Sequence, residues 1–291
     1  GNEYHTAACA DTKIIYFCEI VEGKDKPTEG PHATKEFESQ VDSSVAALVC
    51  QMCKTIQGTG RVVCLDSGFG YVPTVVELLK LGLFSTCVVK KKRGSPKYTR
   101  AEEVLSEIHG EDVGTIIVRK GNSGEQRKFY LAAQADSKHT SIMLRSWATT
   151  RREGPMKKRN VGGEQVEFQY GEYQRWYYYA RHAVDDNNNN RQGCLSYEER
   201  FWPRDWPTRQ FGFLFALLMT NAFLAYNHFV IQKKGKKKIS KSEFLTILSE
   251  EMIENSEWKS ERKEEEEAAE KEGRSHTRHG VEHILCMMKP Y

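Results

Sequence analysis

The sequence predicts an α/β fold in which a mixed sheet carries helices on both faces. Residues 3–91 alternate between short apolar stretches typical of strands and longer stretches with helical spacing. Residues 95–170 add further short strands, as an inserted β-rich segment or as the far side of the sheet. The chain has 291 residues, of which 39% are hydrophobic, and this is enough to bury a core.

The first elements expected are two strands that form a hairpin. The segment EYHTAACAD runs as a strand to Asp11, and KIIYFCEIVEGKD follows after a tight turn. Residues 35–56 then have apolar residues at helical spacing, and Gly58 and Gly60 end that helix. The order up to this point is therefore strand, strand, helix.

A strand that ends at an acid is predicted next, in the stretch RVVCLDSGFGYVPTVVELLKLG. Its apolar run stops at Asp66, and an amphipathic helix follows, with Pro73 near its start and Gly82 just past its end. The segment FSTCVVKK then supplies another strand. A strand, a helix and a strand in this order indicate a sheet with a helix packed on it.

The rest of the chain is less regular. Residues 114–150 predict three or four short strands of antiparallel character, with GNSG as a turn. The basic and glycine-rich residues 151–163 predict a loop. We expect a core domain over residues 1–248 and a charged helical tail over residues 249–291.

Residues 211–231 form an apolar stretch that is long enough to cross a bilayer. Within it, Asn221, Asn227 and His228 would each be costly at membrane depth. A buried core helix is therefore favoured over a membrane span.

Charge and cysteine usage narrow the class of protein. The net charge of +3 does not by itself indicate a polyanionic partner, but cations cluster locally. The eight cysteines show no disulfide framework, and the CxxC of Cys50 and Cys53 fits a packed helix face better than a zinc or redox site. A reducing compartment is expected. The opening residues show no signal peptide, and the lack of an initiator Met is expected of a fragment.

The acids Asp11, Asp66 and Asp185 each occur where an apolar or aromatic segment runs into a turn. Acids at such positions can meet at one edge of a sheet. Carboxylates gathered there repel one another unless a cation neutralises them, and an all-oxygen site suits Mg²⁺ or Mn²⁺. The alternative is that each Asp accepts hydrogen bonds within its own turn, and for any single Asp the pattern alone favours this alternative.

These segments resemble piggyBac-type transposases. The stretch RVVCLDSGFGYVPTVVELLKLGLFSTCVVKKKRG is similar to the family segment that reads strand, Asp, aromatic turn, helix, strand and basic loop. EYHTAACADTKIIYFCEIVEGKD resembles the first catalytic strand and the strand after it, and the AVD of YYYARHAVDDNNNNRQG resembles the family's Gly-Val-Asp. WPRDWPTRQFGFLFALLMTNAFLAYNHF resembles the helical region that follows, so the resemblance covers most of residues 1–231.

The resemblance implies a ribonuclease H-like fold and metal-dependent cleavage and transfer of DNA strands. By motif register, Asp11, Asp66 and Asp185 take the three catalytic and metal-binding positions, with Asp186 as a second candidate for the third ligand. The implied cofactor is Mg²⁺ or Mn²⁺, and the implied partner is DNA in the nucleus. A homodimer is left open, and neither a membrane nor a small-molecule cofactor is expected.

The chain also departs from that family. The upstream DNA-binding and dimerising region and the C-terminal cysteine-rich zinc domain have no counterpart in these 291 residues, and Ala183 stands where the family often has Gly. The alternative function is therefore a domesticated, catalytically inactive module that binds DNA or interacts with chromatin.

Two basic segments are candidates for phosphate contact. The first follows the strand after Asp66 and is expected to contact DNA phosphates. It consists of Lys90, Lys91, Lys92 and Arg93. For the second, Lys233–Lys238, solvated surface lysines are favoured over phosphate contact. A nuclear-import patch explains this segment equally well.

Aromatic residues and a histidine precede the third acid. Trp176 and Tyr177–Tyr179 offer surfaces for base stacking, but packing against the core is the favoured interpretation. His182 offers proton transfer or phosphate contact, with a structural role favoured. Asn187 is a candidate cap for the segment that follows.

Overall fold

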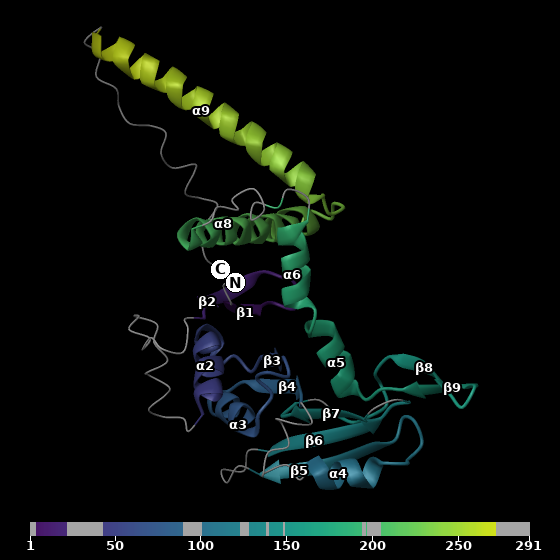
Figure 1. Ribbon diagram of the computed structural model, residues 1–291. Helices are drawn as coiled ribbons and strands as arrows, with labels where there is room; N and C mark the ends of the chain where they lie inside the picture. The colour runs from purple at the N-terminus through teal and green to yellow at the C-terminus, as the bar shows by residue number, and fades with distance from the viewer. Residues whose placement is uncertain are drawn as a thin grey trace. The chain divides into compact units, whose positions relative to one another are not determined.

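The computed structural model describes residues 4–21, 43–89, 101–122, 128–137, 140–147, 149–193, 196 and 205–271 (Figure 1). The chain divides into two compact units, Gly1–Ala225 and Tyr226–Tyr291. The larger unit contains the sheet and all the candidate acids.

A five-stranded mixed sheet with the strand order β3-β4-β7-β6-β5 forms the centre of the larger unit. β3 and β4 are parallel, and the other neighbouring strands are antiparallel. The predicted mixed sheet is therefore confirmed, as are the antiparallel strands expected after residue 114. The strands are β3 (Val62–Leu65), β4 (Phe84–Val88), β5 (Ile116–Asn122), β6 (Lys128–Ala135) and β7 (Thr140–Arg145).

Helices cover both faces of this sheet because its central strands carry apolar residues on both sides. Leu131 and Ala133 of β6 join the main core with residues of α2, α3 and α4. Ala132 lies between them and packs with Tyr173 of α5 on the opposite face, as strand alternation requires. The helices are α2 (Ser44–Met52), α3 (Val72–Lys80), α4 (Ala101–Ile108) and α5 (Glu172–Ala180).

The β3–α3–β4 unit follows the signals in its sequence. Pro73 lies in the first turn of α3, where a backbone N–H is not needed, and Gly82 follows the helix with a φ of +68°, a conformation that favours glycine. Leu78 and Leu83 are 0% and 1% exposed in the core between the helix and the sheet. This unit places Asp66 directly after the last residue of β3.

β1 (Tyr4–Ala8) and β2 (Ile15–Ile20) form the predicted antiparallel hairpin, but this hairpin is a separate two-stranded sheet. We expected the strand before Asp11 to lie side by side with the strand before Asp66. That expectation is wrong, since among the described strands β1 pairs with β2 and β3 pairs with β4.

The hairpin packs on α8 (Trp206–Ala225), and this contact explains why it does not extend the larger sheet. Tyr4 stacks on Phe213 with the ring centroids 3.7 Å apart. Ile15 is buried in the same cluster, and the Asn221 side chain binds both of its backbone groups, at 3.0 Å to the N–H and 2.8 Å to the carbonyl. The helix therefore holds the hairpin through apolar packing and through backbone hydrogen bonds.

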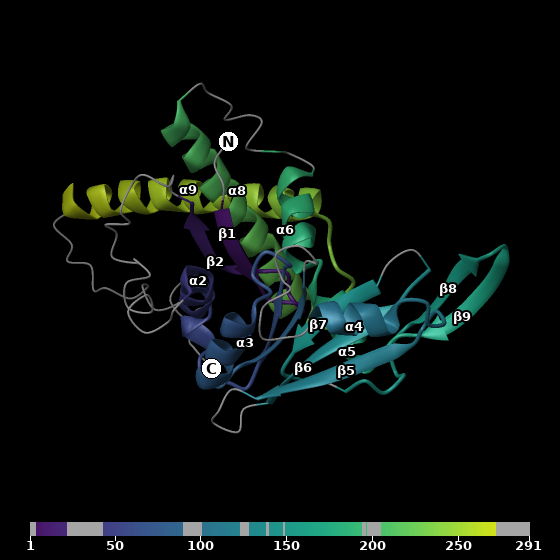
Figure 2. The same cartoon turned by 60° about the horizontal axis from the view of Figure 1, so that its bottom comes forward.

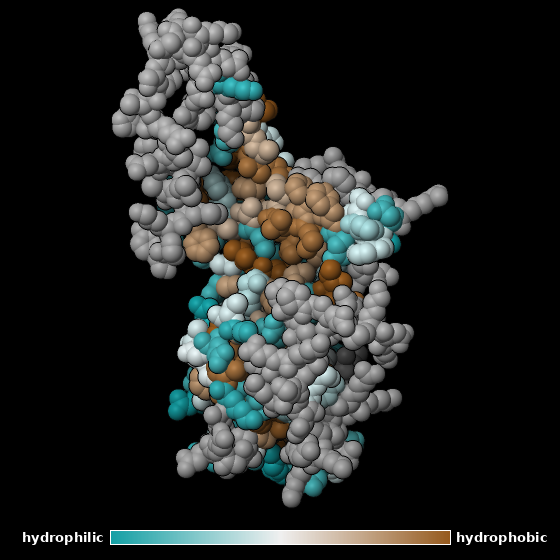
Figure 3. Space-filling model, turned by 90° about the vertical axis from the view of Figure 1, so that its left-hand side faces the viewer, coloured by the Kyte–Doolittle hydropathy of each residue, from teal (hydrophilic) through white to brown (hydrophobic). Residues whose placement is uncertain are grey.

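One described helical run, Trp206–Gln232, has the length and the mean hydropathy of 1.5 that a membrane span needs. Buried helices of soluble proteins meet the same criteria, and 33% of its apolar window is buried. Its α8 part exposes Phe211, Leu214 and Leu218, and hydrophobic side chains gather in this region of the surface in Figure 3. On its other side, α8 makes the contacts with the hairpin that a core helix makes.

A second hairpin, β8 (Met156–Val161) and β9 (Glu164–Gln169), occupies the basic segment where we expected a loop, so that expectation is wrong. Gly162 and Gly163 connect the strands with φ values of +60° and +96°, which suits a two-residue hairpin turn. The cations conceal the strand in the sequence, because they lie on a hairpin that extends away from the end of the main sheet (Figure 2).

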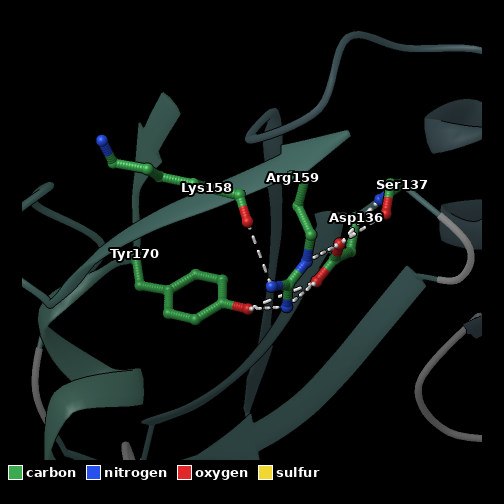
Figure 4. A network of polar contacts seen from close by, with 5 residues as sticks. All are labelled: Asp136, Ser137, Lys158, Arg159 and Tyr170. Atoms are coloured by element: carbon green, nitrogen blue, oxygen red, sulfur yellow. Dashed lines mark hydrogen bonds and ion pairs between the residues drawn. The ribbon is translucent and has the colours of Figure 1, made fainter. Parts of the chain in front are cut away.

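A polar network attaches this hairpin to the main sheet (Figure 4). Arg159 donates to both carboxylate oxygens of Asp136, at 2.7 and 3.0 Å, and the Tyr170 hydroxyl donates to the same acid at 3.3 Å. Partial burial acts to raise the pKa of Asp136, but the hydrogen bonds from Arg159 and from the Ser137 N–H outweigh it and leave the pKa below its usual value. The network therefore holds an ionised acid and binds the hairpin through Arg159 within β8 and Tyr170 just after β9.

The smaller unit contains the π-helix η2 (Tyr226–Gln232) and the long helix α9 (Lys241–Lys271). Asn227 bridges the connection between them by bonding the N–H and the carbonyl of Ile239, at 2.9 and 3.0 Å. Ser240 begins α9 with a reciprocal capping box, in which its hydroxyl accepts from the Glu243 N–H and the Glu243 carboxylate accepts from the Ser240 N–H.

Candidate active site around Asp11, Asp66 and Asp185

Asp11 lies in the tight turn between β1 and β2. Backbone hydrogen bonds of 2.9 Å from Cys9 to Ile14 and from Lys13 to Cys9 close this turn, and Lys13 has a φ of +64°, which is uncommon for a residue with a Cβ. The Asp11 side chain is exposed, and its Oδ1 accepts a hydrogen bond from the hydroxyl of Tyr179. The turn therefore presents the acid outward, where α5 contacts it.

Asp66 directly follows β3 and is also exposed. Its Oδ2 accepts from the Gly68 N–H at 3.3 Å, and its Oδ1 accepts from the Ser67 hydroxyl at 3.4 Å. These contacts are those of an Asp that accepts hydrogen bonds within its own turn, and they leave the remaining lone pairs of the carboxylate accessible to solvent. Gly70 completes the turn, where a Cβ would lie 2.7 Å from the Val88 carbonyl oxygen.

Asp185 and Asp186 lie in the first turn of α6 (Ala183–Gln192), near the positive end of the helix dipole. His182 Nδ1 is 3.7 Å from Asp185 Oδ2, and Asp185 is exposed. Lys13 Nζ is 3.6 Å from Asp186 Oδ2. The two neighbouring acids therefore have different partners, one on its own helix and one on the turn that carries Asp11.

The structure brings the turn of Asp11 and the acids of α6 together. Asn187, which is fully buried, donates from Nδ2 to the Lys13 carbonyl at 2.9 Å and to Asn221 Oδ1 at 3.1 Å. The Lys13 ammonium lies over the Tyr179 ring, 5.6 Å from its centroid. The hydrogen bond that Tyr179 donates to Asp11 raises the pKa of Tyr179, because it favours the protonated hydroxyl.

Asp66 approaches the same group of elements through α5 and β1. Cys64 Sγ lies 3.9 Å from the Tyr177 carbonyl oxygen, and the rings of His5 and Phe69 meet edge to face at 5.9 Å. Burial, followed by the charges of Cys64 and Asp66 among others, raises the pKa of Tyr177 to about 12. The turn after β3 therefore lies beside both α5 and the first hairpin.

The candidate acids fit a divalent cation by chemistry but not by arrangement. Carboxylate oxygens are the ligands that Mg²⁺ and Mn²⁺ prefer. Across the described residues, however, no group of three or more His, Cys, Asp or Glu side chains is close enough to hold a metal ion. The nearest neighbours of Asp11 and Asp186 are instead the hydroxyl of Tyr179 and the ammonium of Lys13.

The other candidate residues either take part in packing and hydrogen bonds within the fold or lie outside the described part of the chain. Lys90 to Arg93 fall outside the described residues. Trp176 packs edge to face with Trp147 at 5.1 Å and with Tyr179 at 6.2 Å, which supports the packing interpretation, although Trp176 remains 39% exposed. Asn187 lies within α6 and makes long-range hydrogen bonds, so its expected role as a helix cap is wrong.

The burial of Cys50 and Cys53 explains why this CxxC sequence occurs in the chain. Cys50 and Cys53 are 1% and 2% exposed, and burial raises the pKa of each thiol to about 12. Both side chains pack among apolar residues of the core, and a protonated, buried thiol does not exchange readily with a disulfide. The interpretation as a packed helix face is confirmed.

Three residues contribute to the site although the sequence analysis does not predict them as site residues: Lys13, Tyr179 and Asn221. Asn221 is a polar residue in an apolar helix, which is a usable signal for a buried hydrogen bond. Tyr179 belongs to an aromatic run whose members the sequence does not distinguish. Lys13 had no signal, because its partner Asp186 lies far along the chain.

Comparisons with known proteins identify a family for this chain and a solved structure of similar fold. A protein-family model described as Transposase IS4 matches residues 1–223, which is more than half of the chain. Among solved structures, the fold is similar to piggyBac transposase in its cryo-EM synaptic complex with hairpin DNA, with a TM-score of 0.51 and 16% identity. This match covers 82% of the chain and 43% of the piggyBac chain, so the chain spans less than half of that transposase. No curated protein matches the chain.

The family match includes the segments that carry Asp11, Asp66 and Asp185. The structural similarity extends over most of the same region and confirms the expected ribonuclease H-like architecture. The chain belongs to the Transposase IS4 family and has the ribonuclease H-like fold of piggyBac transposase.

Proposed function

We propose that this chain is the catalytic core of a DNA transposase, in which Asp11, Asp66 and Asp185 support the cleavage and transfer of DNA strands. Membership of a transposase family carries the proposal, because the matched residues include all three acids. Each acid is exposed at the boundary of an element, in the turn after β1, at the end of β3 and in the first turn of α6. Acids at such boundaries are accessible to a substrate as large as duplex DNA.

The proposed cofactor is Mg²⁺ or Mn²⁺. The residues that would hold it are Asp11, Asp66 and Asp185, with Asp186 as a second candidate for the third position. When bound, the cation would make the attacking hydroxyl more nucleophilic and would stabilise the leaving oxygen. His182, which lies beside Asp185, is placed to orient that carboxylate.

The proposed partner is DNA, and we propose a homodimer as the working assembly because two DNA ends must be handled together. The nucleus is the proposed location. The exposed lysines of residues 233–238 fit an import patch as well as a solvated surface. Neither a membrane nor a small-molecule cofactor is part of the proposal.

Nicking of supercoiled plasmid by the 291-residue chain in Mn²⁺ tests the catalytic role without knowledge of the target sequence. We expect Asp11→Asn, Asp66→Asn and Asp185→Asn each to reduce the nicking rate by at least about 100-fold, because loss of a ligand exceeds the usual effect of changes around one. Asp112→Asn makes the same chemical change at an exposed acid outside the site and should keep the parent rate. Parent-like nicking by any of the three site variants would contradict the assignment.

A second candidate function is a catalytically inactive module that binds DNA. The contacts of Tyr179 and Lys13 with Asp11 and Asp186 favour it, because these acids already have partners. DNA binding that needs no divalent cation, together with absence of nicking and of Mn²⁺ binding, would support this function over catalysis.

A further inference from the structure

Two side chains outside the candidate acids engage their carboxylates from one place. The Tyr179 hydroxyl donates to Asp11 Oδ1, and Lys13 Nζ lies 3.6 Å from Asp186 Oδ2. The same ammonium lies over the Tyr179 ring, 5.6 Å from the centroid. Tyr179 and Lys13 therefore form one contact group, here called the Tyr179–Lys13 pair, that reaches an acid on each of two elements.

We propose that the Tyr179–Lys13 pair is a lock on the metal site, which competes with a divalent cation for the oxygens of Asp11 and Asp186 and must move away before the cation binds. This inference rests on the proposed function, because it takes Asp11 and Asp186, the second candidate for the third position, as metal ligands. It adds two residues, Tyr179 and Lys13, whose role is to set the affinity for the cation.

The competition follows from the chemistry of the contacts. A carboxylate oxygen that accepts a phenol hydrogen bond has one lone pair fewer for a cation. An ammonium within 4 Å of a carboxylate occupies the place of a second positive charge and repels it. The charge of Lys13 therefore partly neutralises Asp186, and the Tyr179 hydroxyl occupies an oxygen of Asp11 that the metal would otherwise use.

The surroundings allow the side chains to move while the backbone stays in place. Tyr179 is 50% exposed, and the Lys13 side chain is 24% exposed, so solvent can receive both. The Lys13 carbonyl, in contrast, accepts from the buried Asn187 side chain at 2.9 Å. Opening the lock therefore requires side-chain rotation and leaves the turn attached to α6.

Mn²⁺ titration monitored by electron paramagnetic resonance of the free ion measures the lock directly, without any need for cleavage. Tyr179→Phe keeps the aromatic ring and removes only the hydroxyl, and Lys13→Met keeps the length of the stem and removes only the charge. A two-state lock lowers apparent affinity by the fraction of open molecules, so we expect each variant to bind Mn²⁺ about tenfold more tightly than the parent. Tyr178→Phe removes a hydroxyl from the same helix that contacts neither acid and should leave the affinity unchanged.

The outcomes separate this inference from the proposed function. Mn²⁺ binding that Asp11→Asn abolishes, but that Tyr179→Phe and Lys13→Met leave unchanged or weaken, would overturn the lock and leave the metal site intact. Absence of Mn²⁺ binding in the parent and in the Tyr179→Phe/Lys13→Met double variant would overturn both. Binding that appears or tightens only when the pair is removed would support the lock.

Discussion

Asn221 connects more elements than its place in an apolar helix suggests. Its amide binds the N–H and the carbonyl of Ile15 and accepts from Asn187. One side chain of α8 therefore joins β2, α6 and, through the Lys13 carbonyl, the turn that carries Asp11. The candidate site depends on this small buried network as much as on its acids.

Asn221→Ala should lower the free energy of unfolding by about 1–3 kcal/mol, because it leaves the backbone groups of Ile15 without their partner in a partly buried contact. Urea unfolding followed by circular dichroism measures the change. Gln165→Ala removes an exposed amide on β9 and should change the same quantity by less than about 0.5 kcal/mol. Equal effects of the two substitutions would show that the network contributes little.

Among the elements, the β8–β9 hairpin is attached in part by the ion pair of Arg159 with Asp136. The Asp136 side chain is only 7% exposed, whereas that of Arg159 is 36% exposed, so the pair lies at the boundary between core and solvent. Its two hydrogen bonds give a fixed geometry that ordinary surface pairs lack. The neighbouring pair of Lys158 and Glu167 lies across the strands at exposures of 67% and 52% and serves as a comparison.

Asp136→Asn should destabilise the chain by about 1 kcal/mol at pH 7, because the folded state then loses the ion pair. The pKa of Asp136 is lowered on folding, so the stabilisation is present above the unfolded pKa and is lost as the pH falls through the folded one. The difference between parent and variant, measured by urea unfolding, should stay constant from about pH 7 to pH 5 and shrink below about pH 4.

Lys158→Ala provides the control on the same strand, since an exposed pair contributes about 0–1 kcal/mol. A pH-independent difference for Asp136→Asn would contradict the assignment of the lowered pKa to the contact with Arg159.

At the scale of the whole molecule, both faces of the five-stranded sheet are packed against helices, so the candidate acids lie in turns and at the ends of elements. Cys87 and Leu144 lie at 0% exposure in the core shared with α2, α3 and α4, and Met143 lies at 1% against α5. Asp11, Asp66 and Asp185 are all exposed. DNA, a polyanion much larger than any one turn, would therefore be recognised by surface charge as well as by the acids.

DNA affinity of the 291-residue chain should fall steeply as salt rises. Replacement of Lys90, Lys91, Lys92 and Arg93 by Ala should reduce the slope of log affinity against log salt by about 0.9 for each phosphate that these cations neutralise. Fluorescence anisotropy with several unrelated duplexes checks this, and all of them should weaken alike. An unchanged slope would remove this segment from the DNA-binding surface.

Much of the fold was predictable because its signals are local. The strand at residues 62–65, the helix after Pro73 and the hairpin at the N-terminus each follow from apolar spacing and from turn residues within a few positions. The same signals wrongly predict a loop over residues 151–163, where the structure has β8. The reason is that a cationic strand lacks the apolar alternation that marks a half-buried strand. The Gly162–Gly163 pair is the remaining sequence signal for its turn, and both glycines have positive φ in the structure.

The sequence by itself determined the strand–helix–strand order, the three acids at element boundaries and the resemblance that family membership confirms. Only the tertiary structure decided that the first hairpin packs on α8, that Asn221 holds it there, and that Tyr179 and Lys13 engage Asp11 and Asp186. The physical reason is that local patterns fix which backbone hydrogen bonds a segment makes with itself and its neighbours. The partners of a side chain depend instead on which distant segments share its surface, and packing of the whole chain sets that choice.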